Sequence, residues 1–249
     1  MIVLKSAEEI KKMRKGGQIV ARVCQKLIEK VKPGITTKEL DQAALQLIGK
    51  HKAYPAFLGF RGFPASICTS VNDQVVHGIP GAYRLREGDI ISIDFGVRYQ
   101  GYYSDMAVTL PVGIISRDAR KLIEVTKSAL DSGITQMVPG NRLYDISAAI
   151  QECAESNGFS VVRDLVGHGI GQEMHEEPQI PNFGKRSTGP SLKAGMVFAL
   201  EPMVNMRGYE VKTLDDNWTV VTTDGSLSCH FEHTVAITDN GPEILTKLH

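Results

Sequence analysis

The strongest constraint on how this chain folds is an internal repeat. The ten residues LREGDIISID (Leu85 to Asp94) align without gaps on LKAGMVFALE (Leu192 to Glu201), at an offset of 107 positions. The dipeptides Pro33-Gly34 and Pro139-Gly140 lie at an offset of 106, and each precedes an Ala-rich helical pattern. The repeat predicts two similar α/β halves. Each half has an apolar sheet face that the other half or its helices must cover, so neither is expected to be an independent domain.

The order of the predicted elements supports this division into halves, at about 1–111 and 112–249. Each half starts with two helical patterns, and a β-rich region follows. Ser6 with Glu9, and Thr36 with Glu39, have the spacing of capping boxes at the starts of the first two helices. The other two helices are predicted over residues 117–135 and 142–156. We therefore expect an α+β protein.

Composition excludes several classes of function. The 28 basic and 28 acidic side chains leave no net charge to attract polyanions, so nucleic acid is not expected as an obligatory partner. The four cysteines form no C-x-x-C pair, which argues against a redox motif or a thiolate zinc site and for reduced, intracellular thiols. No apolar run reaches the roughly 18 residues that span a bilayer. We expect a soluble cytoplasmic protein.

Each copy of the repeat ends an apolar strand in a carboxylate, Asp94 in the first half and Glu201 in the second. A pseudo-dyad between the halves would direct both acids to a shared central cleft. Strands near 89–97 and 102–110 predict a hairpin, and a Tyr99-Gln100 loop would place Asp94 directly opposite Asp105. Like charges so placed are destabilising, so a cation is expected between them. The alternative is that Asp105 is a solvated turn residue.

Two further residues extend this cluster. Glu232 lies in the strand pattern SCHFEHTVAIT, and His168 lies between two glycines in VGHGIG. Either could be a satisfied structural residue, but a divalent cation would stabilise several buried carboxylates at once. An oxygen-rich set with one imidazole suits Mn, Fe(II), Co or Zn, and four carboxylates suit a pair of ions.

Five segments then carry a resemblance to a known family: SIDFG, YYSDMAVT, VGHGIGQEMHEEP, FALEPM and HFEHTVAIT. In this order, over nearly the whole chain, they resemble the metal-ligand motifs of methionine aminopeptidases. The chain is similar to the bacterial-type, type I form, because it has no N-terminal extension and no long insertion between His168 and Glu201. The resemblance implies the pita-bread fold, in which two α/β halves surround a central antiparallel sheet with pseudo-two-fold symmetry, in a single catalytic domain over 1–249.

The resemblance also implies roles for individual residues. Asp94 would chelate one metal ion, His168 and Glu201 the other, and Asp105 and Glu232 would bridge the two. Glu201 would also shuttle a proton, while His175 would stabilise the oxyanion and His77 would contact the substrate amide. The residues that resemble the family's methionine pocket are Phe60, Phe63, Cys68 and Trp218. Many relatives have an aromatic residue where this chain has Met174, a departure that bears on the shape of the pocket.

The implied activity is removal of the initiator methionine from peptides and nascent chains whose second residue is small. The implied cofactors are two divalent ions, from among Co, Mn, Fe(II) and Zn. A monomer is expected, and the ribosome is a possible partner. Two alternatives stay open: an Xaa-Pro aminopeptidase or dipeptidase of the same fold, which usually has a large extra N-terminal domain, and a non-catalytic pita-bread binding protein, which typically loses metal ligands.

Overall fold

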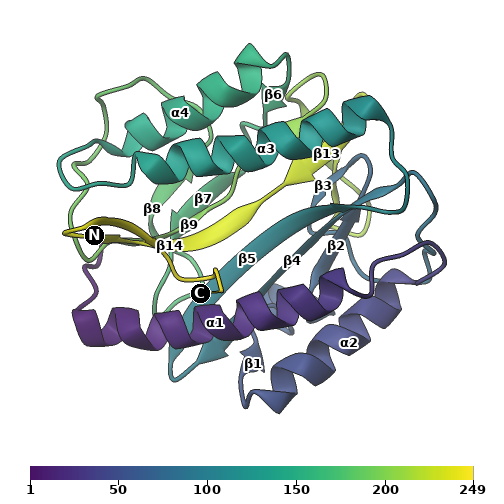
Figure 1. The fold of residues 1–249 in the computed structure, drawn as a ribbon, viewed down its shortest axis with the longest axis horizontal. Coiled ribbons are helices and arrows are strands. Elements are labelled where there is room, and N and C mark those ends of the chain that lie inside the picture. The colour runs from purple at the N-terminus through teal and green to yellow at the C-terminus, as the bar shows by residue number, and fades with distance from the viewer. Residues whose placement is uncertain (249) are drawn as a thin grey trace.

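The structure, a computed structural model, describes residues 1–248. Two pairs of helices lie on the same face of a central sheet, and Figure 1 shows them crossing in front of its strands. Among the described residues, no helix is long and apolar enough to cross a membrane. The helices are α1 (Ala7–Ile28), α2 (Thr37–Lys50), α3 (Arg117–Thr135) and α4 (Leu143–Ser156).

The predicted starts of the first two helices are confirmed. The Ser6 side chain accepts a hydrogen bond from the backbone N–H of Glu9, whose carboxylate accepts from the Ser6 N–H, which completes a capping box. Thr36 and Glu39 form the same arrangement at α2. Local sequence sets these ends because each side chain satisfies a backbone N–H that the helix leaves unpaired.

The strands of the central sheet run in the order β1-β4-β5-β14-β9-β7-β8, with β2 also paired to β4 and β15 to β14. All of these pairs are antiparallel. Their bounds are β1 (Tyr54–Pro55), β2 (Cys68–Val71), β4 (Ile90–Tyr99), β5 (Tyr102–Pro111), β7 (Val166–Gly169), β8 (Glu176–Pro181), β9 (Val197–Leu200), β14 (Glu232–Thr238) and β15 (Gly241–Ile244).

Two small sheets and one short helix complete the structure. One sheet has the order β13-β10-β6 and the other β11-β12-β3. Their bounds are β3 (Gln74–Val76), β6 (Ser160–Val161), β10 (Met203–Asn205), β11 (Val211–Thr213), β12 (Val220–Thr222) and β13 (Ser228–His230), and a 3₁₀ helix covers Phe60–Gly62.

The pseudo-symmetry predicted from the repeat is confirmed in the sheet. The repeat makes β4 of the first half equivalent to β9 of the second. In the order β4-β5-β14-β9 these two are the outer strands and β5 and β14 are the inner ones, so the pseudo-dyad passes between β5 and β14. Equivalent contacts recur at the helix starts, where isolated bridges join Thr36 to Arg84 and Arg142 to Ser191. The α+β class, with two similar halves around a central antiparallel sheet, is therefore the observed fold.

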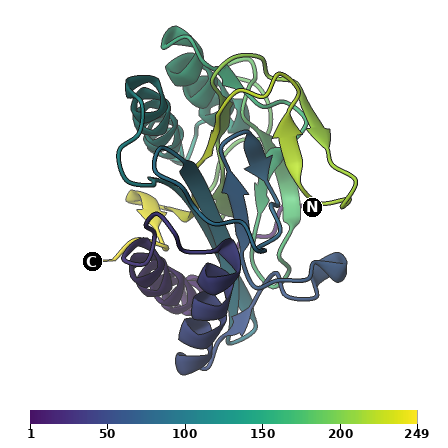
Figure 2. The ribbon, with the colours of Figure 1, turned by 90° about the vertical axis from the view of Figure 1, so that its right-hand side faces the viewer.

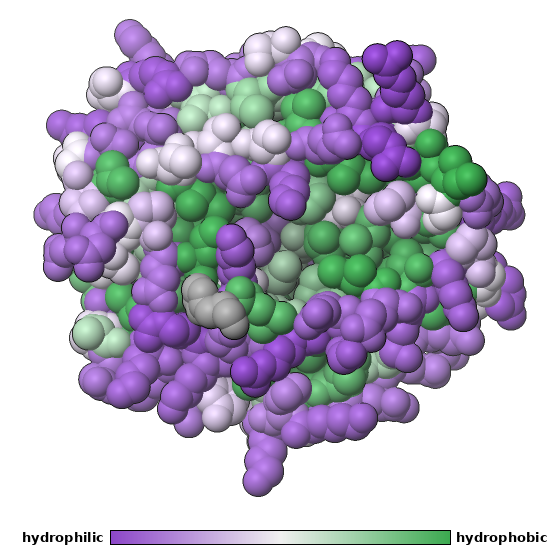
Figure 3. Space-filling model, viewed as in Figure 1, coloured by the Kyte–Doolittle hydropathy of each residue, from purple (hydrophilic) through white to green (hydrophobic). Residues whose placement is uncertain are grey.

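The helices and the candidate site lie on opposite faces of the sheet. Ile93, Phe95 and Val97 of β4 are buried in one core cluster with residues of α1 and α2. Since side chains alternate along a strand, Asp94 points to the other face. Figure 2 shows the helices gathered on one side of the sheet. Val108 packs against this cluster and against the one beneath α3 and α4, and Figure 3 shows apolar side chains between the helices.

The predicted register of the β4–β5 hairpin is wrong. Tyr99 pairs with Tyr102, so the loop is Gln100-Gly101, one position later than expected. Both loop residues have positive φ, 51° and 86°, as a type I′ turn requires, and this geometry selects the glycine for the turn. Asp94 therefore pairs with Ala107, and Asp105 pairs with Gly96. The two acids are diagonal neighbours on one face rather than directly opposed.

Candidate active site

Three acids are arranged around one small side chain in the middle of the sheet. Ala107 of β5 pairs with Asp94 on one side and with Glu232 of β14 on the other. Asp105 lies two residues from Ala107 along β5, on the same face, opposite Gly96. Because Ala107 and Gly96 occupy little space, the three carboxyl groups can converge above them.

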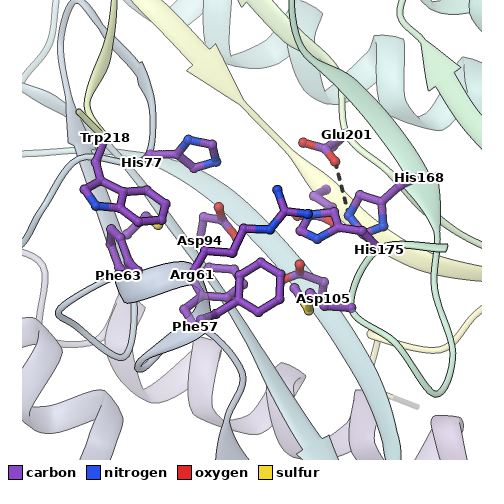
Figure 4. A pocket seen from close by; sticks show the side chains of 14 residues that line it. Phe57, Arg61, Phe63, His77, Asp94, Asp105, His168, His175, Glu201 and Trp218 are labelled. Atoms are coloured by element: carbon purple, nitrogen blue, oxygen red, sulfur yellow. Dashed lines mark ion pairs between the residues drawn. The ribbon is translucent and has the colours of Figure 1, made fainter. Parts of the chain in front are cut away.

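Glu201 and His168 approach this cluster from the second half. Glu201 directly follows β9. Because Leu200 of β9 pairs with His233 of the antiparallel β14, the next position along β9 places Glu201 opposite Glu232. On the next strand His168 pairs with Ala199, and its Nδ1 donates to the carbonyl of Gly169 at 2.8 Å. This bond leaves Nε2 as the acceptor nitrogen, 3.6 Å from Oε1 of Glu201, the contact drawn as a dashed line in Figure 4.

The four carboxyl groups of the cluster lie close together without a basic partner among the described residues. None of the four carboxyl groups forms a salt bridge with a lysine or arginine within residues 1–248. Burial raises the pKa of Asp105 to about 7. Burial, and then the neighbouring acids, raise the pKa of Asp94, Glu201 and Glu232 well above the usual values. Without a cation, the folded site therefore holds protons more tightly than exposed carboxyl groups do.

The donor atoms fit a divalent cation. Asp105, His168 and Glu232 each offer one ligand atom, and these atoms lie within 4.8 Å of one another. Oδ1 of Asp94 and Oε1 of Glu232 are buried and have no hydrogen-bond partner among the described residues. Burial lowers the pKa of His168 to about 4, with a smaller contribution from His175, so its imidazole is neutral and can act as a ligand at neutral pH.

These residues line a cavity of about 170 Å³, and every predicted substrate-binding residue is also part of its lining. At one end the Phe63 and Trp218 rings meet edge to face with centroids 5.1 Å apart, beside the buried thiol of Cys68. Figure 4 shows this aromatic end on one side of the acids and the pair His168 and His175 on the other. The ring of Phe60 lies 5.4 Å from that of His175.

The two predicted catalytic histidines also line the cavity. His77 follows β3 with a φ of 59°, a strained conformation for a residue other than glycine, and its ring lies 6.3 Å from Trp218. His175 is exposed at the mouth, with its ring 4.3 Å from that of His168. Burial lowers the pKa of His77 to about 4. Partial desolvation of the ring, and then the charge of Arg61, lower the pKa of His175, so both rings are neutral donors at neutral pH.

The structure adds Phe57 and Arg61 to the cavity lining, and no sequence motif singled these residues out. Met174, which was expected to bear on the shape of the pocket, forms part of the cavity wall as a buried side chain. His230 is buried with Nε2 3.6 Å from Oε2 of Glu201, whereas His233 bonds Thr246 on the other face of the sheet. The alternation of side chains along the SCHFEHTVAIT strand is enough to place His233 and Glu232 on opposite faces of the sheet. The position of His230 near Glu201, in contrast, depends on the tertiary fold.

Close packing beside His168 yields a testable expectation. A Cβ at Gly169 would overlap the carbonyl oxygen of Glu177 on β8, and neither backbone can move freely. We expect Gly169→Ala to lower the free energy of unfolding by about 2 kcal/mol, as overpacking does, in urea titrations. Gly49→Ala is the control, because a Cβ there meets nothing within 4 Å and Ala favours a helix. Equal stabilities of the two variants would contradict the packing argument.

Comparison with known proteins agrees with this geometry. The model of metallopeptidase family M24 matches residues 11–239. The methionine aminopeptidase of Clostridium perfringens is 59% identical, with all of both chains covered. The crystal structure of a methionine aminopeptidase from Thermotoga maritima is 46% identical with a TM-score of 0.98, again over all of both chains.

A more distant structure shares the fold over part of its length. The prolidase from Pyrococcus furiosus is 25% identical with a TM-score of 0.79, and the match covers 99% of this chain but 66% of the prolidase. The buried acids, the neutral imidazole and the family match converge on one conclusion: the chain belongs to metallopeptidase family M24 and has its metal-dependent, pita-bread architecture.

Proposed function

We propose that this protein is a methionine aminopeptidase, which hydrolyses the first peptide bond of chains that begin with methionine and continue with a small residue. The observation that carries the proposal is the convergence of three buried carboxyl groups, the half-buried Glu201 and a neutral imidazole on a cavity with an aromatic, sulfur-containing end. The names of the full-length relatives support the same activity.

The aromatic end suits the methionine side chain. A thioether is polarisable and interacts favourably with ring edges, and Phe63 and Trp218 offer both ring faces and edges. Cys68 adds a small apolar contact, because burial and the nearby acids raise the pKa of its thiol well above the usual value. Phe60 and the flexible Met174 shape the wall nearer the reacting bond, where they limit the second residue.

The carboxylate cluster is proposed to hold two divalent ions. Asp94 would bind one, His168 and Glu201 the other, and Asp105 and Glu232 would bridge them, in keeping with the unpartnered oxygens of Asp94 and Glu232. When bound, such ions polarise the scissile carbonyl and make water a stronger nucleophile. Ligand type does not select among Co, Mn, Fe(II) and Zn.

The surrounding side chains have separate tasks in this proposal. Glu201 takes the proton from the attacking water and delivers it to the leaving amine. His175, neutral and at the mouth, donates a hydrogen bond to the oxyanion, an interaction that strengthens as negative charge develops. His77 contacts the substrate amide from the opposite wall. The free α-amino group of the substrate faces the acids, so formylated chains would be excluded.

The proposal also covers the domain organisation of the protein, its location and its partners. Residues 1–249 act as a single catalytic domain with halves at about 1–111 and 112–249, which agrees with the contacts of Val108 to both core clusters. The substrates are peptides and nascent chains in the cytoplasm, the protein is a monomer, and the ribosome is a candidate docking partner.

Metal reconstitution tests the function directly. We expect protein stripped with a chelator to be inactive on Met-Ala-Ser, and Co, Mn, Fe(II) or Zn to restore activity by at least about 1000-fold, since the ions supply both polarisation and water activation. Release of methionine is measured by chromatography. Ala-Pro-Ser is the matched substrate for the Xaa-Pro alternative. Cleavage of that peptide alone would replace the proposal, and no cleavage with any metal would end it.

The non-catalytic alternative has its own test. Asp94 offers an unpartnered carboxylate oxygen to the cavity and forms no salt bridge, so Asp94→Ala should abolish Met-Ala-Ser hydrolysis while leaving the fold intact. A variant that fully retained the biological output of the wild type would favour a binding role.

A further inference from the structure

Arg61 is the one cation among the residues that line the catalytic cavity. Its side chain is exposed, and within residues 1–248 it forms no hydrogen bond and no ion pair. Its guanidinium carbon lies 5.4 Å from the centroid of the Phe60 ring. Figure 4 shows the side chain extending across the front of the cavity toward His175, so the charge is held at the entrance.

The backbone holds Arg61 in this position at a cost. Its φ of 49° and ψ of 24° place it in the left-handed region, which is unfavourable for residues with a Cβ. The flanking glycines Gly59 and Gly62, with φ of 79° and 89°, allow the chain to make this turn. A strained residue at a cavity is the usual sign of a functional constraint.

The position of Arg61 relative to the reacting bond determines which part of a peptide substrate it can contact. With the methionine side chain among Phe63 and Trp218 and the scissile carbonyl beside His175, the rest of the peptide leaves past Phe60 and Arg61. In an extended chain about 7 Å separates the first residue from the third, so the third residue lies beyond the reacting bond, on the side of Arg61. That Arg61 contributes to lowering the pKa of His175 agrees with its closeness to the reacting centre.

We propose that Arg61 is a specificity-determining residue that selects substrates with an acidic side chain at the third position. This inference rests on the proposed function and names its substrate class more narrowly. The cavity has a cluster of carboxyl groups inside and one positive charge at its mouth, which matches a peptide with an N-terminal ammonium group and a carboxylate two residues later. A guanidinium without an ionic partner is free to pair with that carboxylate.

The test compares three amidated peptides that differ only in the third residue: Met-Ala-Glu-Ser, Met-Ala-Gln-Ser and Met-Ala-Lys-Ser. For the metal-loaded wild type we expect kcat/KM about fivefold higher for Glu than for Lys, the size of an exposed ion pair. Arg61→Ala should give nearly equal values, and Arg61→Glu should invert the order. In about 1 M salt the preference should collapse, because the Debye length falls to about 3 Å.

Lys30→Glu provides the matched control. Lys30 is exposed just after α1, on the helix side of the sheet, and its substitution changes the net charge of the protein by the same amount as Arg61→Glu. We expect it to leave the order of the three peptides unchanged. An unchanged order in Arg61→Glu, or an equal shift in Lys30→Glu, would overturn the inference.

A binding measurement separates this inference from the proposed function. Trp218 is the single tryptophan of the chain and lies at the cavity wall, so its fluorescence reports occupancy without turnover. Metal-free wild type should bind the Glu peptide about fivefold more tightly than the Lys peptide, and Arg61→Ala should not. If no metal supports cleavage of any of these peptides, the proposed function fails, while the fluorescence result still decides the role of Arg61.

Discussion

Glu201→Gln is expected to lower kcat for Met-Ala-Ser by at least about 1000-fold. The substitution keeps the size of the side chain but removes the proton acceptor, which alone is worth roughly 10²- to 10⁴-fold, and it weakens a proposed metal ligand. Glu201 is suited to proton transfer because its side chain is 15% exposed, so it can reach both a buried metal and incoming water. Steady-state kinetics of the metal-loaded variant measures the loss.

The stability of the metal-free variant distinguishes a chemical role from a structural one. Burial and the neighbouring Asp105 make an ionised Glu201 unfavourable, so a neutral Gln should leave the metal-free protein as stable as the wild type or more stable. If Glu201 were instead a structural salt-bridge partner, Glu201→Gln would lower the stability of the metal-free protein. Glu124→Gln on the exposed face of α3 is the control and should alter neither activity nor stability. Activity within tenfold of the wild type would exclude Glu201 as the proton carrier.

Much of the fold could be predicted because its information is local or repeated. Capping residues fix the start of a helix through bonds to their own neighbours, which explains why the Ser6 and Thr36 boxes were correct. The alignment of Leu85 to Asp94 on Leu192 to Glu201 predicted the pseudo-dyad, since segments with the same pattern of apolar residues form equivalent strands in the two halves. The hairpin register was wrong because it depends on which two residues take positive φ, and Gly101 rather than Tyr99 belongs in that turn.

The site shows the same division between local and tertiary information. Acids in apolar strands stand out from their neighbours, and the structure brings Asp94, Asp105 and Glu232 to one cavity as expected. His230 lies beside Glu201 because the fold brings together segments distant in sequence, and Arg61 reaches the cavity through a local turn with no apolar periodicity. Neither contact leaves a pattern in the chain. The roles of the individual ligands stay predictions until a metal is bound.

The last prediction concerns pH and Asp105. Burial raises its pKa in the folded protein to about 7, from 3.8 in the unfolded chain. The folded state therefore holds this proton more tightly, and the metal-free protein loses stability as pH rises from about 4 to about 7. Asp105→Asn removes the titration, so relative to wild type the variant should gain on the order of 4 kcal/mol across this range, measured by urea unfolding with a chelator present.

The comparison with the variant isolates the carboxyl group from the histidines. Burial lowers the pKa of His77, His168 and His230, which destabilises the folded state as pH falls below about 6.5, but these residues are present in both proteins and largely cancel in the difference. Adding Mn or Co should reverse the order, because wild type then has a ligand that the variant lacks, and the metal displaces the retained proton. A stability difference that did not vary with pH would mean that Asp105 is ionised in the metal-free fold, and the charge argument for the cation site would fail.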